Sequence, residues 1–191
     1  MKGADASAPR PSRTSHLRSA SAVDALRRFL IRHRNPLRRA CTACAVAVPL
    51  AFAAGALVVD GWAARRFLLL YVAPFFVAFF LWARVRLGWM ETGRSAVLVV
   101  DGIAVVLGAI RFAGLPVPFS GHMLFFTYAG LTTPSASFRL LAVLLAAETT
   151  WFKLALWRDP HSWALGIAVG AALAAARIFI HRNSPDPTRD R

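Results

Sequence analysis

Apolar residues run through most of this chain in long stretches, which short basic or polar segments separate. Each stretch approaches the ~20 residues that an α-helix needs to cross about 30 Å of hydrocarbon. The pattern predicts six membrane spans, which we place at residues 41–59, 67–83, 96–113, 119–133, 138–157 and 162–181. The predicted fold class is therefore all-α, a polytopic membrane protein built as a six-helix transmembrane bundle.

These spans leave little of the chain outside the bilayer. We predict one membrane domain at residues 41–181, between a basic tail at residues 1–40 and a short tail at residues 182–191. Within the first tail, "VDALRRFLIRHR" places Leu26 and Phe29 on one side of a helix and arginines around the others. This pattern favours an amphipathic helix on the membrane surface, and a disordered basic tail is the alternative.

Composition agrees with a membrane protein and indicates that the positive net charge faces lipid headgroups. Hydrophobic residues make up 57% of the chain, above the roughly 45–50% of soluble domains. The net charge is +14, and residues 1–40 hold ten of the 23 lysines and arginines. Such a cluster before a first span marks the cytoplasmic side and attracts anionic lipid headgroups. No recognisable nucleic-acid-binding module accompanies the charge, so we expect no nucleic-acid partner.

Charge also predicts the topology. If all six segments cross, the loop that carries Arg84, Arg86 and Arg94 lies on the cytoplasmic side together with both termini. The excess of arginine there agrees with the positive-inside rule. We therefore predict an integral protein of the cytoplasmic (inner) membrane. The shortest predicted span, residues 119–133, measures only about 22 Å as a helix.

This topology brings three segments to the outer face: the end of the third span, the start of the fourth, and the turn between the fifth and sixth. Most polar residues there are cationic or able to carry a proton, with Asp159 the only nearby acid. Arginine gives forked hydrogen bonds to phosphate oxygens, lysine a point charge, and a helix start further N–H donors. A phosphate-bearing anion is the favoured ligand. The candidate residues are Arg111, Ser120, Gly121, His122, Lys153, Arg158 and His161.

The triplet Ser120-Gly121-His122 at the start of the fourth span has the most specific chemistry. Ser120 can cap the helix and donate its hydroxyl, and Gly121 lets the backbone approach a ligand closely. His122 can attack phosphorus or pass a proton to a leaving oxygen. The structural alternative for His122 is a helix-capping histidine at the membrane interface.

The motifs of this half resemble the type 2 phosphatidic acid phosphatase superfamily, which contains lipid phosphatases and related lipid phosphotransferases. "FSGHMLFFTYAGLTT", the basic turn "WRDPHS" and the six-span layout carry the resemblance over roughly residues 96–181. In that family Pro-Ser-Gly-His opens one helix. An Arg, then five residues, a His, three residues and an Asp precede a Gly-rich final helix. Here Ser120, Gly121 and His122 match directly, with Phe119 in place of the proline.

The resemblance implies a lipid phosphate or diphosphate substrate at the outer face, with no cofactor and no metal. It makes His122 the general acid and His161 the candidate nucleophile. The remaining candidates, Arg111, Ser120, Gly121, Lys153 and Arg158, would hold the phosphate. The second half of the site departs from the family, because an ungapped alignment places Arg158 at the nucleophilic His and Ser162 at its Asp. Hydrolysis or transfer and phosphate binding without turnover both remain open.

Two intramembrane carboxylates favour other classes of function. Asp101 lies in the third predicted span and Glu148 in the fifth, and buried acids often mark ion pathways because burying them is costly. The alternatives are a small proton-linked transporter and a non-catalytic membrane interaction protein. Cys41 and Cys44 form a C-x-x-C pair that no second pair completes as a zinc site, so we interpret them as packing residues.

Overall fold

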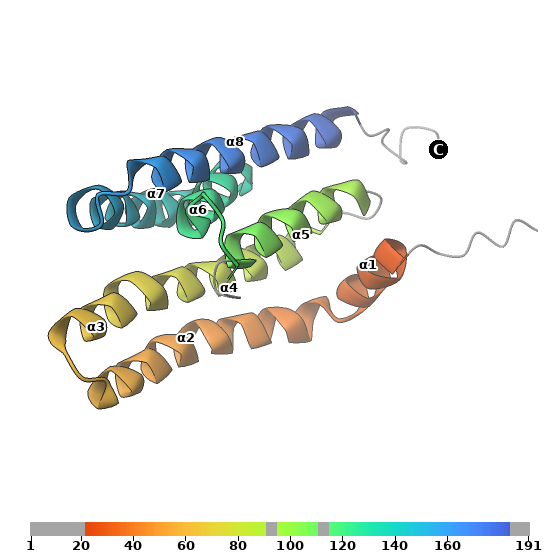
Figure 1. The fold of residues 1–191 in the computed structure, drawn as a ribbon. Helices are drawn as coiled ribbons and strands as arrows, with labels where there is room; N and C mark the ends of the chain where they lie inside the picture. The colour runs from red at the N-terminus through yellow and green to blue at the C-terminus, as the bar shows by residue number, and fades with distance from the viewer. Residues whose placement is uncertain (1–21, 91–94, 111–114, 184–191) are drawn as a thin grey trace, which may run out of the picture.

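The computed structural model describes residues 22–90, 95–110 and 115–183, which contain helices joined by short loops and no strand (Figure 1). The helices that correspond to the six predicted spans run side by side along a common direction, and α1 crosses one end of them. In chain order the elements are α1 (Ala22–Arg32), α2 (Arg34–Val58), α3 (Trp62–Phe67), η1 (Leu68–Val72), α4 (Ala73–Gly88), α5 (Ser95–Ala109), α6 (Gly121–Thr132), α7 (Ala136–Trp151), η3 (Phe152–Leu156) and α8 (Pro160–Asn183).

The predicted all-α class is confirmed for the described residues, and three helices are long and apolar enough to cross a membrane. They are Arg34–Val58, Trp62–Gly88, which joins α3, η1 and α4, and Pro160–Asn183. A shorter apolar helix lies at Ser95–Ala109. These helices indicate a membrane-embedded protein, and the full set of six crossings stays a prediction.

Most helices extend further than the sequence-based spans. α2 begins at Arg34 and α8 continues to Asn183, although the predicted spans covered only residues 41–59 and 162–181. The predicted bounds followed hydropathy, whereas arginine is a good helix former and continues a helix past its apolar part. The third span was expected to reach residue 113, but α5 ends at Ala109.

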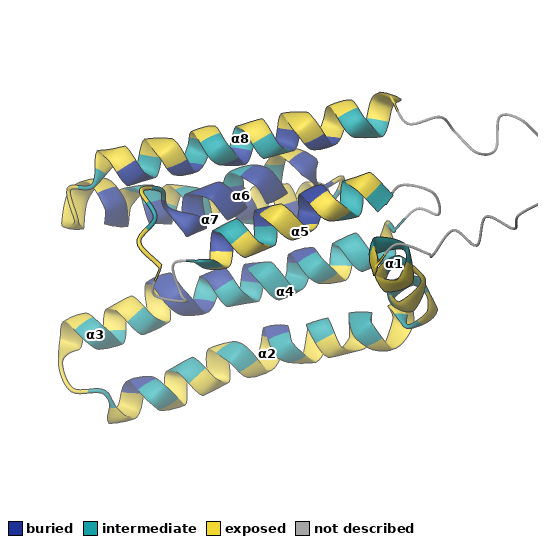
Figure 2. Ribbon diagram, turned by 45° about the vertical axis from the view of Figure 1, so that its right-hand side comes forward, coloured by how far each residue is buried: buried dark blue, intermediate teal, exposed yellow. Residues whose placement is uncertain are grey.

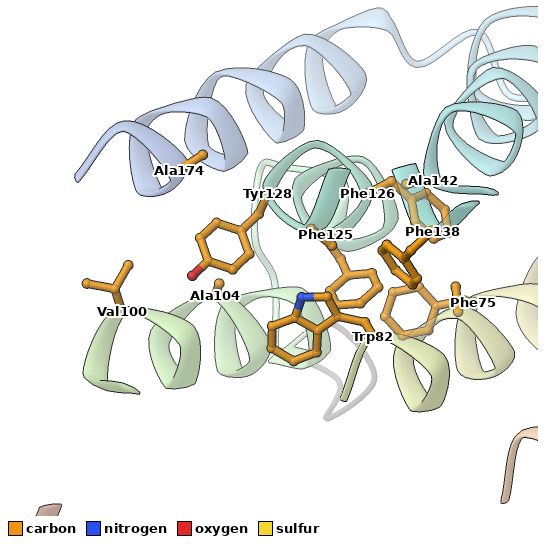
Figure 3. Close-up of a cluster of buried hydrophobic side chains, with 12 residues drawn as sticks. Phe75, Trp82, Val100, Ala104, Phe125, Phe126, Tyr128, Phe138, Ala142 and Ala174 are labelled. Atoms are coloured by element: carbon orange, nitrogen blue, oxygen red, sulfur yellow. The ribbon is translucent and has the colours of Figure 1, made fainter. Parts of the chain in front are cut away.

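The short helix α6 is the centre of the fold. It has 12 residues, about 18 Å at 1.5 Å per residue, and nine of them are buried. Figure 2 shows it as the most continuously buried helix. The aromatic side chains of Phe125 and Phe126 pack against Phe75 and Trp82 of α4 (Figure 3), with edge-to-face ring contacts. Other helices therefore cover α6 on several sides, whereas a helix at the edge of a bundle would leave one side facing lipid.

Glycines let the backbones of α5 and α8 approach α6 closely. A Cβ at Gly166 would lie 2.7 Å from the carbonyl oxygen of Ser120, and one at Gly170 would lie 2.5 Å from that of Leu124. Gly166 and Gly170 are four residues apart, the spacing of small residues at tightly packed membrane helices. The "Gly-rich" last helix therefore has a packing role against the helix that starts at Gly121.

Candidate functional site

A cavity of about 370 Å³ lies where the start of α6, the end of α5 and the turn between η3 and α8 meet. Segments that are far apart in the sequence contribute to its wall, including η1 through Tyr71. The lining residues are Tyr71, Gly108, Ser120, Gly121, His122, Lys153, Trp157 and Asp159. Four of the seven candidate residues from the sequence are in this set.

Ser120 fixes the start of α6 and connects it to α8. Its backbone is extended, and its hydroxyl oxygen accepts a hydrogen bond from the N–H of Met123 at 3.4 Å, as an N-cap residue does. Its own N–H donates to the carbonyl oxygen of Ser162 at 2.8 Å. This bond joins the first turns of α6 and α8, so the two motif segments lie at the same end of the helices.

His122 is buried and forms part of the cavity wall. Its ring stacks on Tyr71 with 4.0 Å between ring centroids, and Phe75 packs at 4.4 Å on a tilted plane. Its Nε2 lies 3.3 Å from the carbonyl oxygen of Tyr71. A carbonyl oxygen only accepts, so this contact requires the ring proton on Nε2. The aromatic contacts fix the plane of the imidazole, and a fixed imidazole suits either a positioning or an acid role.

Lys153 brings a buried positive charge to the same cavity. It lies in η3, a π-helical turn that continues α7, and its side chain is only 4% exposed. The Nζ atom donates to Oδ2 of Asp159 at 3.0 Å and to Oγ of Ser162 at 3.1 Å, and lies 5.1 Å from the ring centroid of Trp157. These contacts satisfy the charge within the protein.

Asp159 is the partner of Lys153 and also the cap of α8. Its carboxylate accepts a short hydrogen bond from the Ser162 hydroxyl and a second, at 3.2 Å, from the Ser162 N–H. Pro160 follows at the first position of α8, where proline is favoured. The hydrogen bond from the Ser162 side chain, helped by Lys153, lowers the pKa of Asp159 to about 2. The carboxylate is therefore ionised at neutral pH.

This lowered pKa predicts how the stability of the site depends on pH. When the folded-state pKa of a carboxylate is below its ordinary value of 3.8, its ionised form stabilises the fold at every pH above 3.8. The contribution is lost as pH falls from 3.8 toward about 2. We expect the difference in unfolding temperature between wild type and Asp159→Asn to be constant from pH 8 to pH 5 and to shrink only below pH 4. Thermal unfolding in one detergent across this range measures it, and a difference that vanishes between pH 7 and pH 5 contradicts the assignment.

The structure separates the candidate residues into groups. Ser120, Gly121, His122 and Lys153 line the cavity, whereas Arg158 and His161 are exposed and are not among its lining residues. The predicted site residue Arg111 lies outside the described residues. Arg158 has a positive φ of 50°, in the left-handed region. The roles given to Arg158 and His161 by the family resemblance stay predictions.

The sequence reasoning missed how Asp159 takes part in the site. The family alignment placed Ser162 where a carboxylate is expected, and the structure brings the Asp159 carboxylate directly against the Ser162 hydroxyl. An Asp-Pro pair ahead of an apolar run is typical of a helix N-cap, and this signal could have located it. Tyr71 and Gly108 were missed as well, because only packing of distant helices brings them here.

No model of a known protein family, no curated protein and no solved structure matches this chain. The resemblance to type 2 phosphatidic acid phosphatases thus rests on the Ser120-Gly121-His122 triplet and the turn before α8, and it stays a prediction. Any function for the chain has to be argued from the cavity itself.

Proposed function

We propose that this chain is a lipid phosphatase-like integral membrane protein that binds a lipid phosphate or diphosphate in the cavity at the start of α6. One observation carries the proposal. Lys153, His122 and Gly121, the first residue of α6, line one cavity of about 370 Å³, although Lys153 and His122 are 31 positions apart in the sequence. A buried cation beside the start of a helix in one small space is what recognition of a phosphate requires.

Each wall of the cavity has a part in holding phosphate. The first N–H groups of a helix have no partner within the helix, and they carry the positive end of its dipole. Gly108 and Gly121 have no side chains to keep an anion away from this backbone. Lys153 adds the full positive charge, and Trp157 forms an apolar wall beside it. A phosphate oxygen that reaches Lys153 would share its Nζ with Asp159, so we expect moderate affinity.

The geometry favours binding over turnover. The Nε2–H of His122 already donates to the carbonyl oxygen of Tyr71, so this ring is better suited to positioning the cavity wall than to passing a proton to the bound group. The residue that the resemblance makes the nucleophile, His161, is exposed and is not among the residues lining the cavity. The Nζ atom of Lys153 is held in an ion pair with Asp159, and an ammonium group in an ion pair has no free electron pair with which to attack phosphorus. We therefore propose a site that binds phosphate without transferring it.

We place this site at the outer face of the cytoplasmic membrane, with six crossings and both termini in the cytoplasm. The apolar helices Arg34–Val58, Trp62–Gly88 and Pro160–Asn183 support the membrane setting. The hydrogen bond between Ser120 and Ser162 supports a common end for the two motif segments. Side-specific labelling of single cysteines placed at exposed positions in intact cells, such as His161→Cys and Arg28→Cys, tests the orientation.

A ligand-dependent thermal shift tests the proposal. We expect a short-chain phosphatidic acid to raise the unfolding temperature of the purified full chain in neutral detergent. At a ligand concentration 100 times Kd the added stability is about 2.7 kcal/mol. The matched control is the diacylglycerol with the same acyl chains, which lacks only the phosphate. Equal shifts with both lipids would contradict phosphate recognition.

The same protein tests the absence of turnover. We expect no phosphate release from phosphatidic acid or an isoprenoid diphosphate by wild type. Release that His122→Ala and His161→Ala both abolish would overturn the binding-only version and assign the nucleophile to His161.

A further inference from the structure

A second and larger cavity, of about 570 Å³, lies at the opposite end of the helices. Ser162 near the first cavity and Arg177 at the second are about 22 Å apart along α8 at 1.5 Å per residue. The second cavity is formed by the end of α4, the starts of α5 and α7, the ends of α6 and α8, and α1. The lining residues that set its character are Arg27, Arg86, Asp101, Thr133, Arg139 and Arg177.

This cavity carries an excess of positive charge. Of the residues that the structure describes, four arginines line it and Asp101 is the one carboxylate there. Asp101 accepts a short hydrogen bond from Arg86 and one from Nε of Arg177 at 3.2 Å, and the Tyr128 hydroxyl also donates to it. These partners account for the burial of Asp101 without an ion pathway. Arg27 and Arg139 have no ion-pair partner in the part of the chain that the structure describes.

Several polar atoms around the cavity are buried and lack a hydrogen-bond partner among the described residues. They include Nε of Arg27, Nε of Arg86 and Oγ1 of Thr133. Thr133 is only 3% exposed, so bulk water does not replace the missing partner. Buried polar groups in folded proteins are nearly always satisfied, and each exception needs a cause. All three groups can donate, so a ligand rich in acceptor oxygens would satisfy them together.

The helix α1 indicates where such a ligand comes from. The Ser95 hydroxyl donates to the carboxylate of Asp24 at 2.6 Å, and this bond holds α1 against the start of α5. Beside Arg27, the side chains of Leu26 and Phe29 are 50% and 53% exposed. An amphipathic helix with exposed apolar residues and arginines inserts at the headgroup level of a bilayer. The cavity that α1 helps to form then opens among lipid headgroups.

We propose that this second cavity binds the phosphate of an anionic lipid headgroup, as a site separate from the cavity at Lys153. Arginine forks match the oxygens of a phosphate, and basic pockets between membrane helices are suited to anionic headgroups. Arg139 on α7 and Arg27 on α1 supply the unpaired charges, and the Thr133 hydroxyl adds a donor. The bound phosphate would connect α1 to the end of the helical domain.

The test uses the full chain carrying Lys153→Met, so that failure of the first cavity does not affect the result. Native mass spectrometry in neutral detergent counts bound phosphatidylglycerol, and a separate titration uses inorganic phosphate. We expect Arg27→Gln with Arg139→Gln to weaken binding by at least about tenfold, the effect of losing charge-assisted hydrogen bonds. The matched control, Arg28→Gln with Arg182→Gln, removes two exposed charges that do not line the cavity.

The two titrations distinguish the sources of phosphate. Binding that the lining variant weakens and the control variant does not supports the site, and the stronger ligand identifies lipid or free phosphate as its source. Equal weakening by both double variants would mean general surface attraction and would overturn the proposal, as would no binding of either ligand. If the double variant does not fold, Arg139→Gln alone, at an exposed position, gives the same comparison with Arg182→Gln.

Discussion

Lys153→Met is expected to weaken the binding of phosphatidic acid to the cavity at the start of α6 by about 10- to 100-fold. Among the described residues that line this cavity, Lys153 is the one full positive charge, and methionine retains the size of its apolar stem. Loss of a hydrogen bond to a charged group costs about 1.5–3 kcal/mol, which is roughly a 10- to 100-fold loss in affinity. Calorimetric titration with short-chain phosphatidic acid in detergent measures the change.

Asp159→Asn is expected to act in the opposite direction. In wild type the Asp159 carboxylate accepts a hydrogen bond from Nζ of Lys153 at 3.0 Å and competes with an incoming phosphate. Asparagine caps a helix about as well as aspartate, so α8 should keep its first turn. A partly exposed ion pair contributes up to about 1 kcal/mol, so its removal should tighten phosphate binding by roughly fivefold.

The opposite signs make this pair of variants decisive. Arg158→Met is the matched control, since it removes the same charge from a neighbouring exposed residue that does not line the cavity. We expect its affinity to stay within about twofold of wild type, as for surface charges in general. If Lys153→Met and Asp159→Asn both leave the affinity unchanged and only lower the unfolding temperature, the Lys153–Asp159 pair is structural and the proposed phosphate site is wrong.

Local signals in the sequence predicted much of the fold. Apolar runs of nearly membrane length located the helices, because hydrophobic content over about 20 residues is a strong signal. Ser120 was predicted to cap the fourth helix, and its hydroxyl accepts the N–H of Met123. Asp159 was noted only as an acid near the basic turn, yet it forms the corresponding cap of α8. Caps are readable from sequence because their partners lie within one turn.

The arrangement of the cavity could not be predicted in the same way. Tyr71 reaches His122 across 51 positions, and nothing in the local pattern around "LLLYVAPFF" indicates a ring that stacks on an imidazole. Lys153 lies at the same cavity because it is only six positions before Asp159, a separation that the sequence does show. The backbone of Arg158 has a positive φ that the sequence does not predict, since residues in the left-handed region are usually glycine or asparagine.

Close packing of glycines is the other feature that sequence alone does not locate. The Gly-rich last helix was noted as part of the family resemblance, but its meaning depends on which helix faces it. In the structure Gly166 and Gly170 face α6, and Gly108 of α5 meets Gly121 at the start of α6. Backbone contacts therefore hold the helices around the cavity close together, and Gly108 and Gly121 line it without side chains.

Gly121→Ala is accordingly expected to destabilise the fold and remove phosphate binding together. The new Cβ would lie 2.2 Å from the carbonyl oxygen of Gly108 and 3.1 Å from its carbonyl carbon. These are backbone atoms of α5, so no side-chain rotation relieves the contact and the helices must separate. Overpacking costs about 1–3 kcal/mol, more than the roughly 1 kcal/mol that alanine gains over glycine within a helix.

Gly102→Ala is the matched control for this overpacking, because Gly102 lies in α5 and its Cβ would meet nothing within 4 Å. At this position alanine changes only the helix propensity, so Gly102→Ala should unfold at or slightly above the wild-type temperature. Gly121→Ala should unfold several degrees below it, since for a chain of this size about 1 kcal/mol corresponds to roughly 2–4 °C. Thermal unfolding of both variants in the same detergent makes the comparison. Equal unfolding temperatures would mean that α5 and α6 do not pack through Gly108 and Gly121, and the cavity that these two glycines line would then lose its structural basis.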